Sequence, residues 1–256
     1  MSDQSQFVEY ISFTGNNECM LPCLAGITPG LTSWDEAIHS VEPFEAMANV
    51  VKHIDIENSP LGSENALSVN YHSNNLRVNL GIGSETSHEE MLVNSVIMTL
   101  VSDDNGTNDS GWRLLQQNSL NMKSLLLEYG MPEIVFLSTD FGVPEYPEVN
   151  ISTLFIYPEY QFVIDYPRRG VVDINTLMSC EPSDHFILTV VDDGDKINSI
   201  EALASTLETK QLNIEYWTPY KEVTDLPIDA FYEDYILSSS GCFSFPIDAW
   251  QFMLDN

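Results

Sequence analysis

Apolar and polar residues alternate along two neighbouring stretches in the first half of the chain. In residues 66–72 and 76–82 the apolar side chains fall on every second position, and a Ser-Asn-Asn turn separates the two stretches. This alternation is typical of antiparallel strands that bury one face. Residues 93–101, rich in apolar and β-branched side chains, predict a third strand. We therefore predict a meander here, followed by a polar loop at residues 102–111.

A helix is predicted to precede this meander. Ser33 and Glu36 have the spacing of a capping box, in which each side chain bonds the backbone N–H of the other residue. Asp35 and Glu36 also suit the positive N-terminal end of a helix. The helix is expected to run past Val41 to about Pro43.

The same order of elements recurs after residue 111. Residues 114–129 carry apolar side chains with the spacing of one helix face, and Gly130 and Pro132 predict the end of that helix. The strands predicted next span residues 133–138, 152–157 and 161–166. In the less regular remainder, we predict a strand at residues 186–191 and helices at residues 199–207 and 229–237.

Two successive groups of a helix and a meander indicate an α+β fold with an internal duplication. We predict two two-layer α/β units, each with a helix packed on an antiparallel meander, and an irregular C-terminal extension. Residues 1–111 form the first unit, with an N-terminal cysteine loop, and residues 112–256 form the second unit with the extension. Residue identity between the halves is low, so the duplication rests on the order of elements.

The net charge restricts the possible partners. The chain has 9 Lys and Arg against 39 Asp and Glu, a net charge of −30, although only 19% of its residues are charged. The acidity therefore comes from the scarcity of basic residues, and salt adaptation is a secondary explanation. Nucleic acid and anionic membranes require a basic surface, so we exclude both as partners. No apolar run reaches the ~18 residues that a transmembrane segment needs.

The cysteines bear on the compartment. Cys19 and Cys23 are close together, whereas Cys180 and Cys242 are far apart. An even number with one close pair favours disulfides and an oxidising compartment, and the alternative is four buried thiols in a cytosolic protein. The first ten residues contain no signal sequence. We expect an extracytoplasmic protein, secreted or lipid-anchored, whose export signal is absent from this chain.

Three segments of the chain resemble a group of uncharacterised exported bacterial proteins. Residues 19–37 read CMLPCLAGITPGLTSWDEA and match the signature C-x-L-P-C…G-I-x-P-G-x-T-x-W-x-E-A that opens the mature chains of that group. Residues 129–135 and the ending around Phe231, Cys242 and Trp250 also look like that group. Leu24 and Ala25 depart from it, because an aromatic residue is expected there. The resemblance implies an exported protein.

The order of helix and meander resembles two better-understood groups at the level of the fold. These are the small outer-membrane-assembly lipoproteins and the tandem-repeat β-lactamase inhibitor protein. Both are two-layer α/β binding modules without catalysis. The resemblance implies a fold and a class of function, but it does not carry over a partner.

The motifs for catalysis and metal binding are weak. Ser183, Asp184 and His185 contain the residue types of a hydrolase triad, but adjacent residues rarely converge their side chains, and no G-x-S-x-G motif is present. We predict no catalytic residue, no cofactor and no metal site. The first alternative is a hydrolase whose pocket combines distant residues. The second is a structural domain that weakly binds calcium through acidic loops such as residues 192–195, although no loop matches the EF-hand pattern.

One predicted hairpin and the turn after it suggest a binding surface. Their aromatic and basic residues are Phe155, Tyr157, Tyr160, Phe162, Tyr166, Arg168 and Arg169. Aromatic side chains on an open sheet face are common contact anchors. The alternative, which strand alternation favours, is that a helix covers these rings and that they form core. We predict a non-catalytic protein that binds a protein or a cell-envelope component through a free sheet face.

Overall fold

An antiparallel sheet dominates the computed structural model of the chain. The structure describes residues 21–45, 50–55, 65–72, 76–87, 90–102, 122–140, 148–173, 176–179, 185–198, 202, 217–223, 227–237 and 243–246. The strands are β1 Val50–Asp55, β2 Asn65–His72, β3 Leu76–Ser87, β4 Glu90–Ser102, β5 Ile134–Asp140, β6 Glu148–Tyr157, β7 Phe162–Asp173, β8 Thr176–Ser179, β9 His185–Val191, β10 Thr218–Pro219 and β11 Phe243–Pro246. The helices are α2 Trp34–Ser40, α3 Glu42–Glu45, α5 Met122–Tyr129, α7 Tyr220–Val223 and α8 Ile228–Leu237, with 3-10 turns η1 Pro158–Tyr160 and η2 Gly194–Ile197. The chain is thus an α+β protein in which strands predominate.

The strands predicted from alternation are confirmed and are longer than predicted. β3 continues past residue 82 to Ser87, with a register shift between Gly83 and Ser84 against β4. β7 continues past residue 166 to Asp173. β1 was not predicted, because its sequence VVKHID mixes apolar and basic residues at positions that face both ways.

The helix predictions are confirmed where the structure describes them. α2 begins after the N-cap Ser33 with the capping box formed, but it ends at Ser40, and α3 follows as a separate short turn. α5 occupies the last part of the predicted helix 114–129, and Gly130 follows it with a φ of 78°, the conformation that ends many helices. α8 matches the predicted helix at residues 229–237. Apart from Ala202, the predicted helix 199–207 lies outside the described residues.

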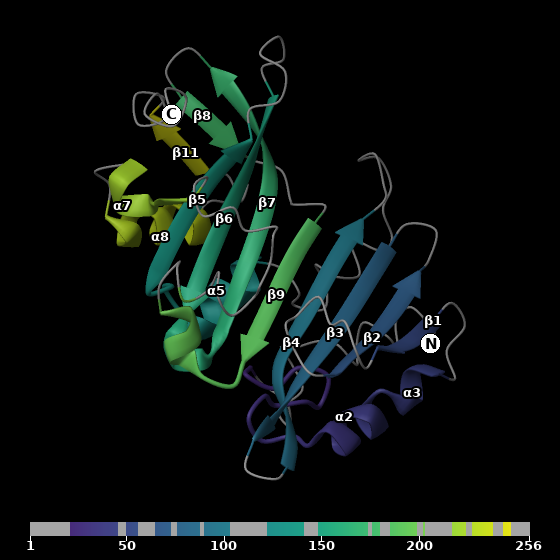
Figure 1. Cartoon of the computed structure of the whole chain (residues 1–256). Helices are drawn as coiled ribbons and strands as arrows, with labels where there is room; N and C mark the ends of the chain where they lie inside the picture. Colours follow the sequence, from purple (N-terminus) through teal and green to yellow (C-terminus); the bar gives the residue numbers. More distant parts are fainter. Residues whose placement is uncertain are drawn as a thin grey trace.

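The sheet joins the two halves of the chain through β4 and β9. The strand order is β1-β2-β3-β4-β9-β7-β6-β5-β10, and β8 pairs with β7 and β11. β4 and β9 are neighbouring antiparallel strands (Figure 1). Met98 of β4 lies opposite Leu188 of β9. Moving outward from this pair, one side runs β3, β2, β1 and the other runs β7, β6, β5, both in reverse chain order, and the late strand β10 is added at the outer edge of β5. The two meanders therefore meet at the middle of one continuous sheet.

Helices cover one face of this sheet. Ala37 and Val41 around α2 and Leu125 and Leu126 of α5 are buried in one core with inward-facing residues of both meanders. Figure 1 shows α5 behind β6 and β7. Partly buried Tyr232 of α8 packs against the same core. This arrangement forms the helix layer of a two-layer fold.

A second, smaller core lies on the opposite face of the second meander. Neighbours in sequence along a strand point to opposite faces, so Leu154 and Ile156 face away from Phe155 of the main core. Ile197 of η2 and partly buried Trp217 cover this smaller core. Both faces of the sheet are therefore packed in the second half of the chain.

The segment before α2 connects both halves of the molecule. The Leu21 N–H donates to the Tyr129 Oη at the end of α5, at 3.2 Å. Further along, the Gly30 N–H donates to the Val93 carbonyl in β4 at 2.7 Å, and a Cβ on Gly30 would lie 3.1 Å from the Cβ of Asp192. Among the described residues no helix is long and apolar enough to cross a membrane.

Candidate functional site

The aromatic residues predicted as a binding surface are mostly core. Phe155, Tyr157, Phe162 and Tyr166 are buried, and Tyr160 alone of the five is exposed, at 40%. The alternative that these rings form core is therefore the correct interpretation for four of them. The expected surface of aromatic anchors on this hairpin is wrong, because α5 covers that face of the sheet.

Ring packing explains this burial. The Tyr157 and Phe162 rings stack with centroids 4.6 Å apart, and Tyr129 of α5 meets the Phe162 ring edge-on at 5.1 Å. The Tyr157 Oη donates to the Gly130 carbonyl at 2.9 Å. Burial raises the pKa of Tyr129 to about 12 and raises the pKa of Tyr157 further. These phenols stay protonated near neutral pH and are structural groups.

The structure places the predicted basic residues and one of the triad-like residues only by their strands. Arg168 and Arg169 lie in β7, opposite Ile151 and Asn150 of β6. Ser183 and Asp184 lie outside the described residues, and His185 is the first residue of β9. The hydrolase alternative therefore stays a prediction.

Of the four cysteines, Cys23 lies within the described residues. Cys23 takes part in a disulfide. Cys19, Cys180 and Cys242 lie outside the described residues. The pairing of the four cysteines stays a prediction.

The acidic loop at residues 192–195 has a structural role. The Asp193 Oδ1 accepts a hydrogen bond from the Asp195 N–H at 2.9 Å and caps η2. Within the described ranges, no three His, Cys, Asp or Glu side chains are grouped to hold a metal ion. The second acidic loop, at residues 102–111, lies almost entirely outside those ranges.

The outward face of the first meander is largely polar where its side chains are described. His72, Arg77, Asn79 and Glu85 are exposed there. The Asn79 amide donates to the Asn70 Oδ1 across β2 and β3 at 2.6 Å. The exposed side chains described on this face include no aromatic anchor.

An open groove runs along α2 and the loop before it. It has a volume of about 620 Å³ and is lined by Gly26, Thr28, Leu31, Thr32, Asp35, Glu36, His39 and Ser40. The loop holds its shape through the Thr28 N–H, which donates to the Thr32 Oγ1 at 2.9 Å, and through the Val93 N–H, which donates to the Thr32 carbonyl. The groove is therefore built on a segment fixed to β4.

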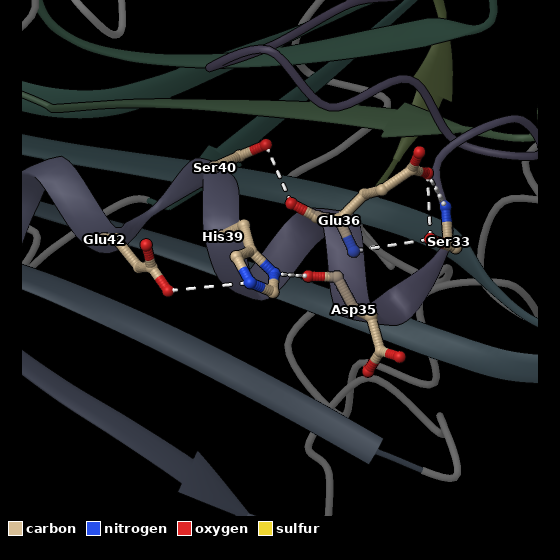
Figure 2. Close-up of polar contacts among 6 residues, drawn as sticks. All are labelled: Ser33, Asp35, Glu36, His39, Ser40 and Glu42. Atoms are coloured by element: carbon tan, nitrogen blue, oxygen red, sulfur yellow. Dashed lines mark hydrogen bonds and ion pairs between the residues drawn. The ribbon is translucent and has the colours of Figure 1, made fainter.

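The capping box fixes the groove wall at the start of α2 (Figure 2). The Glu36 Oε2 accepts hydrogen bonds from the Ser33 N–H at 3.0 Å and from the Ser33 hydroxyl at 2.8 Å. The Ser33 Oγ in turn accepts from the Glu36 N–H at 3.3 Å. The bond from the Ser33 backbone, followed by that from its side chain, lowers the pKa of Glu36. This carboxylate is charged and held in place.

The His39 imidazole and the Ser40 hydroxyl in the groove are both hydrogen-bonded to backbone carbonyls of α2. The His39 Nδ1 donates to the Asp35 carbonyl at 2.6 Å, and its Nε2 lies 3.9 Å from the Glu42 Oε1. The Ser40 hydroxyl donates to the Glu36 carbonyl at 3.0 Å (Figure 2). A nucleophile needs its proton directed at a base. Here the Ser40 hydroxyl directs its proton at the Glu36 carbonyl, which is not a base.

Two groove residues are left open to a ligand. Leu31 is 79% exposed, the most exposed large hydrophobic side chain in the described part of the chain. Asp35 is exposed, and its carboxylate forms none of the contacts drawn in Figure 2. An exposed apolar side chain and a carboxylate in one groove are typical of a binding surface rather than of a catalytic site. The sequence marked this segment as a helix start and as part of a family signature, but not as a groove, because exposure of Leu31 has no signal in the residue pattern.

Comparison with protein families, curated proteins and solved structures found no match to this chain. The resemblance to exported bacterial proteins therefore stays a prediction.

Proposed function

We propose that this protein is a non-catalytic, extracytoplasmic binding protein that engages a protein or a cell-envelope component through the groove beside α2. The observation that carries the proposal is Leu31. Its side chain is 79% exposed on a loop that backbone hydrogen bonds fix to β4. Large apolar side chains held rigidly in solvent gain free energy when a partner covers them.

The groove chemistry supports binding over catalysis. His39 and Ser40 donate to backbone carbonyls, and Glu36 is bonded to Ser33. These contacts stiffen the wall of the groove, so a partner meets a preorganised surface.

We propose further that the chain consists of two helix-plus-meander units, residues 1–111 and 112–256. The mirrored strand order on the two sides of β4 and β9 supports this division. The groove would then belong to the first unit, and β9 of the second unit would complete the sheet beside it.

Site-specific photo-crosslinking tests the proposed function. Benzoylphenylalanine replaces Leu31 in one variant and Leu127 in a second, and each protein is irradiated in cells of the native source. Leu127 is the matched control because it is also an exposed leucine, at 60%, on α5. We expect one discrete adduct from position 31, in the envelope or extracellular fraction, and none of that mass from position 127.

Competition decides whether the adduct reports a specific site. Added wild-type protein should suppress the position-31 adduct, whereas the Leu31→Arg protein should not. No adduct at position 31, or equal adducts at both positions, would refute the groove as the binding surface. An adduct confined to the cytosol would refute the compartment.

A further inference from the structure

We infer that the occupant of the α2 groove is a positively charged segment of a partner protein, in which Lys or Arg side chains flank an apolar side chain. This inference rests on the proposed function, because it names the class of partner for the same groove.

The charge of the groove favours a cationic occupant. Its lining contains two carboxylates, Asp35 and Glu36, and neither Lys nor Arg. Glu42 adds a third carboxylate just after α2. The chain as a whole carries a net charge of −30. A basic segment is therefore attracted at long range and again at contact, whereas an acidic segment is repelled.

The two carboxylates have different roles. Glu36 already accepts two hydrogen bonds from Ser33, so much of its capacity is used inside the capping box. Asp35 is exposed in the first turn, and its carboxylate forms none of the contacts drawn among the groove residues in Figure 2. Asp35 is thus the carboxylate that a Lys or Arg side chain would pair with.

Leu31 distinguishes a protein segment from a small cation. A metal ion or a polyamine would satisfy the carboxylates but would leave Leu31 in water. A protein segment with an apolar side chain next to its basic ones covers Leu31 and pairs Asp35 at the same time. Leu31 and Asp35 line the same groove.

Peptide binding measured by fluorescence polarisation tests the inference. The probes are a fluorescein-labelled peptide of alternating Lys and Leu, the same peptide with Ser for Leu, and the same peptide with Glu for Lys. The variants are Leu31→Ser and Asp35→Asn. Their matched controls are Leu127→Ser, an exposed leucine elsewhere, and Asp229→Asn, an exposed acid in the first turn of α8.

We expect the Lys-Leu peptide to bind the wild type most tightly and the Glu-Leu peptide not to bind. Asp35→Asn should weaken binding of both Lys peptides about three- to tenfold. Leu31→Ser should weaken binding of the Lys-Leu peptide by a similar factor. It should leave the affinity for the Lys-Ser peptide within about twofold of the wild-type value. Both control variants should stay within about twofold of the wild type.

Three results would overturn the inference. Equal weakening by Asp35→Asn and Asp229→Asn would show attraction to the overall charge alone. Equal affinity for the Lys-Leu and Lys-Ser peptides would show that Leu31 takes no part in binding. Displacement of the Lys-Leu peptide by an equal concentration of spermidine would show that the groove binds small cations. If position 31 crosslinks but no Lys peptide binds, the proposed function stands and this inference fails. If neither occurs, both fail.

Discussion

The backbone N–H of Leu21 donates a hydrogen bond to the Tyr129 Oη, at 3.2 Å, between residues that are 108 positions apart in the chain. Leu21 begins the segment that leads to α2, and Tyr129 ends α5, so this bond ties the first helix region to the second. Burial of Tyr129 keeps its phenol protonated, with a pKa of about 12. The connection is therefore independent of pH over the range in which most proteins work.

Tyr129→Phe should destabilise the protein by about 1–2 kcal/mol, because it leaves the buried Leu21 N–H without its acceptor. Tyr232→Phe is the control. It also removes a hydroxyl from a hydrogen bond, which is partly buried, but the Leu126 carbonyl that accepts this bond still accepts from the Gly130 N–H. Urea unfolding measures both free energies, and amide hydrogen exchange at Leu21 should accelerate in Tyr129→Phe alone. Unchanged exchange at Leu21 would contradict the proposed connection.

Gly30→Ala should destabilise the protein more than Gly130→Ala does. Both glycines have a positive φ, 76° and 78°, which costs an alanine about 1–2 kcal/mol. Gly130 has open space around it, whereas a Cβ on Gly30 would meet the Cβ of Asp192 at 3.1 Å. Comparison of the two melting temperatures isolates the cost of that contact. Equal losses would show that Asp192 moves away freely.

Asp165 should make the stability depend on pH. Burial raises its pKa to about 7 from 3.8, despite a hydrogen bond from Ser152, and its buried Oδ1 has no hydrogen-bond partner among the described residues. Between about pH 4 and 7 the folded state keeps this proton and the unfolded state releases it. The free energy of unfolding therefore falls as the pH rises through this window and levels off above it.

Asp165→Asn should remove that slope. Between pH 4 and pH 8 the wild type should lose on the order of 2–4 kcal/mol more free energy of unfolding than Asp165→Asn does. Asp229→Asn, which changes an exposed carboxylate, supplies the control. A wild-type slope that persists in Asp165→Asn would assign the pH dependence to other groups.

Ser33→Ala should cost about 1 kcal/mol at pH 7, the usual effect of losing an N-cap. The cost should shrink in acid. The pKa of Glu36 is lowered in the folded state, so its contribution is present above the ordinary value of 4.5 and is lost as the pH falls through the lowered one. Unfolding curves at pH 7 and pH 3 for both proteins measure the difference. Ser33→Thr, which keeps a hydroxyl cap, should behave nearly as the wild type does.

The local elements of this fold could be predicted from the sequence because their signals are local. Alternation in residues 66–72 identified β2, and the Ser33 and Glu36 spacing identified the start of α2. The pairing of β4 with β9 could not be predicted in this way. It joins Ser95 to Val191, and no local pattern specifies a partner that far along the chain.

The candidate site was harder to predict than the fold. Alternation placed Phe155 and Tyr157 on one face of β6, but only the position of α5 determines that this face is buried. Conversely, Leu31 reads as an ordinary apolar residue next to a helix start. Its exposure follows from the fixed loop around Thr28 and Thr32, which turns the side chain away from the core.

The central β4–β9 pair also has a consequence for how the chain reaches its native state. Within each meander, strands pair with near neighbours in sequence, and those contacts form at little cost in chain entropy. The β4–β9 pair closes a loop of about ninety residues, and the bond from Leu21 to Tyr129 closes one of similar length. Closing loops of this length costs more chain entropy than pairing neighbouring strands does. We therefore expect the rate of refolding to be set by the joining of two preformed meanders. Conservative substitutions at Met98 or Leu188 should then slow refolding more than equally destabilising ones at Val69 or Leu154.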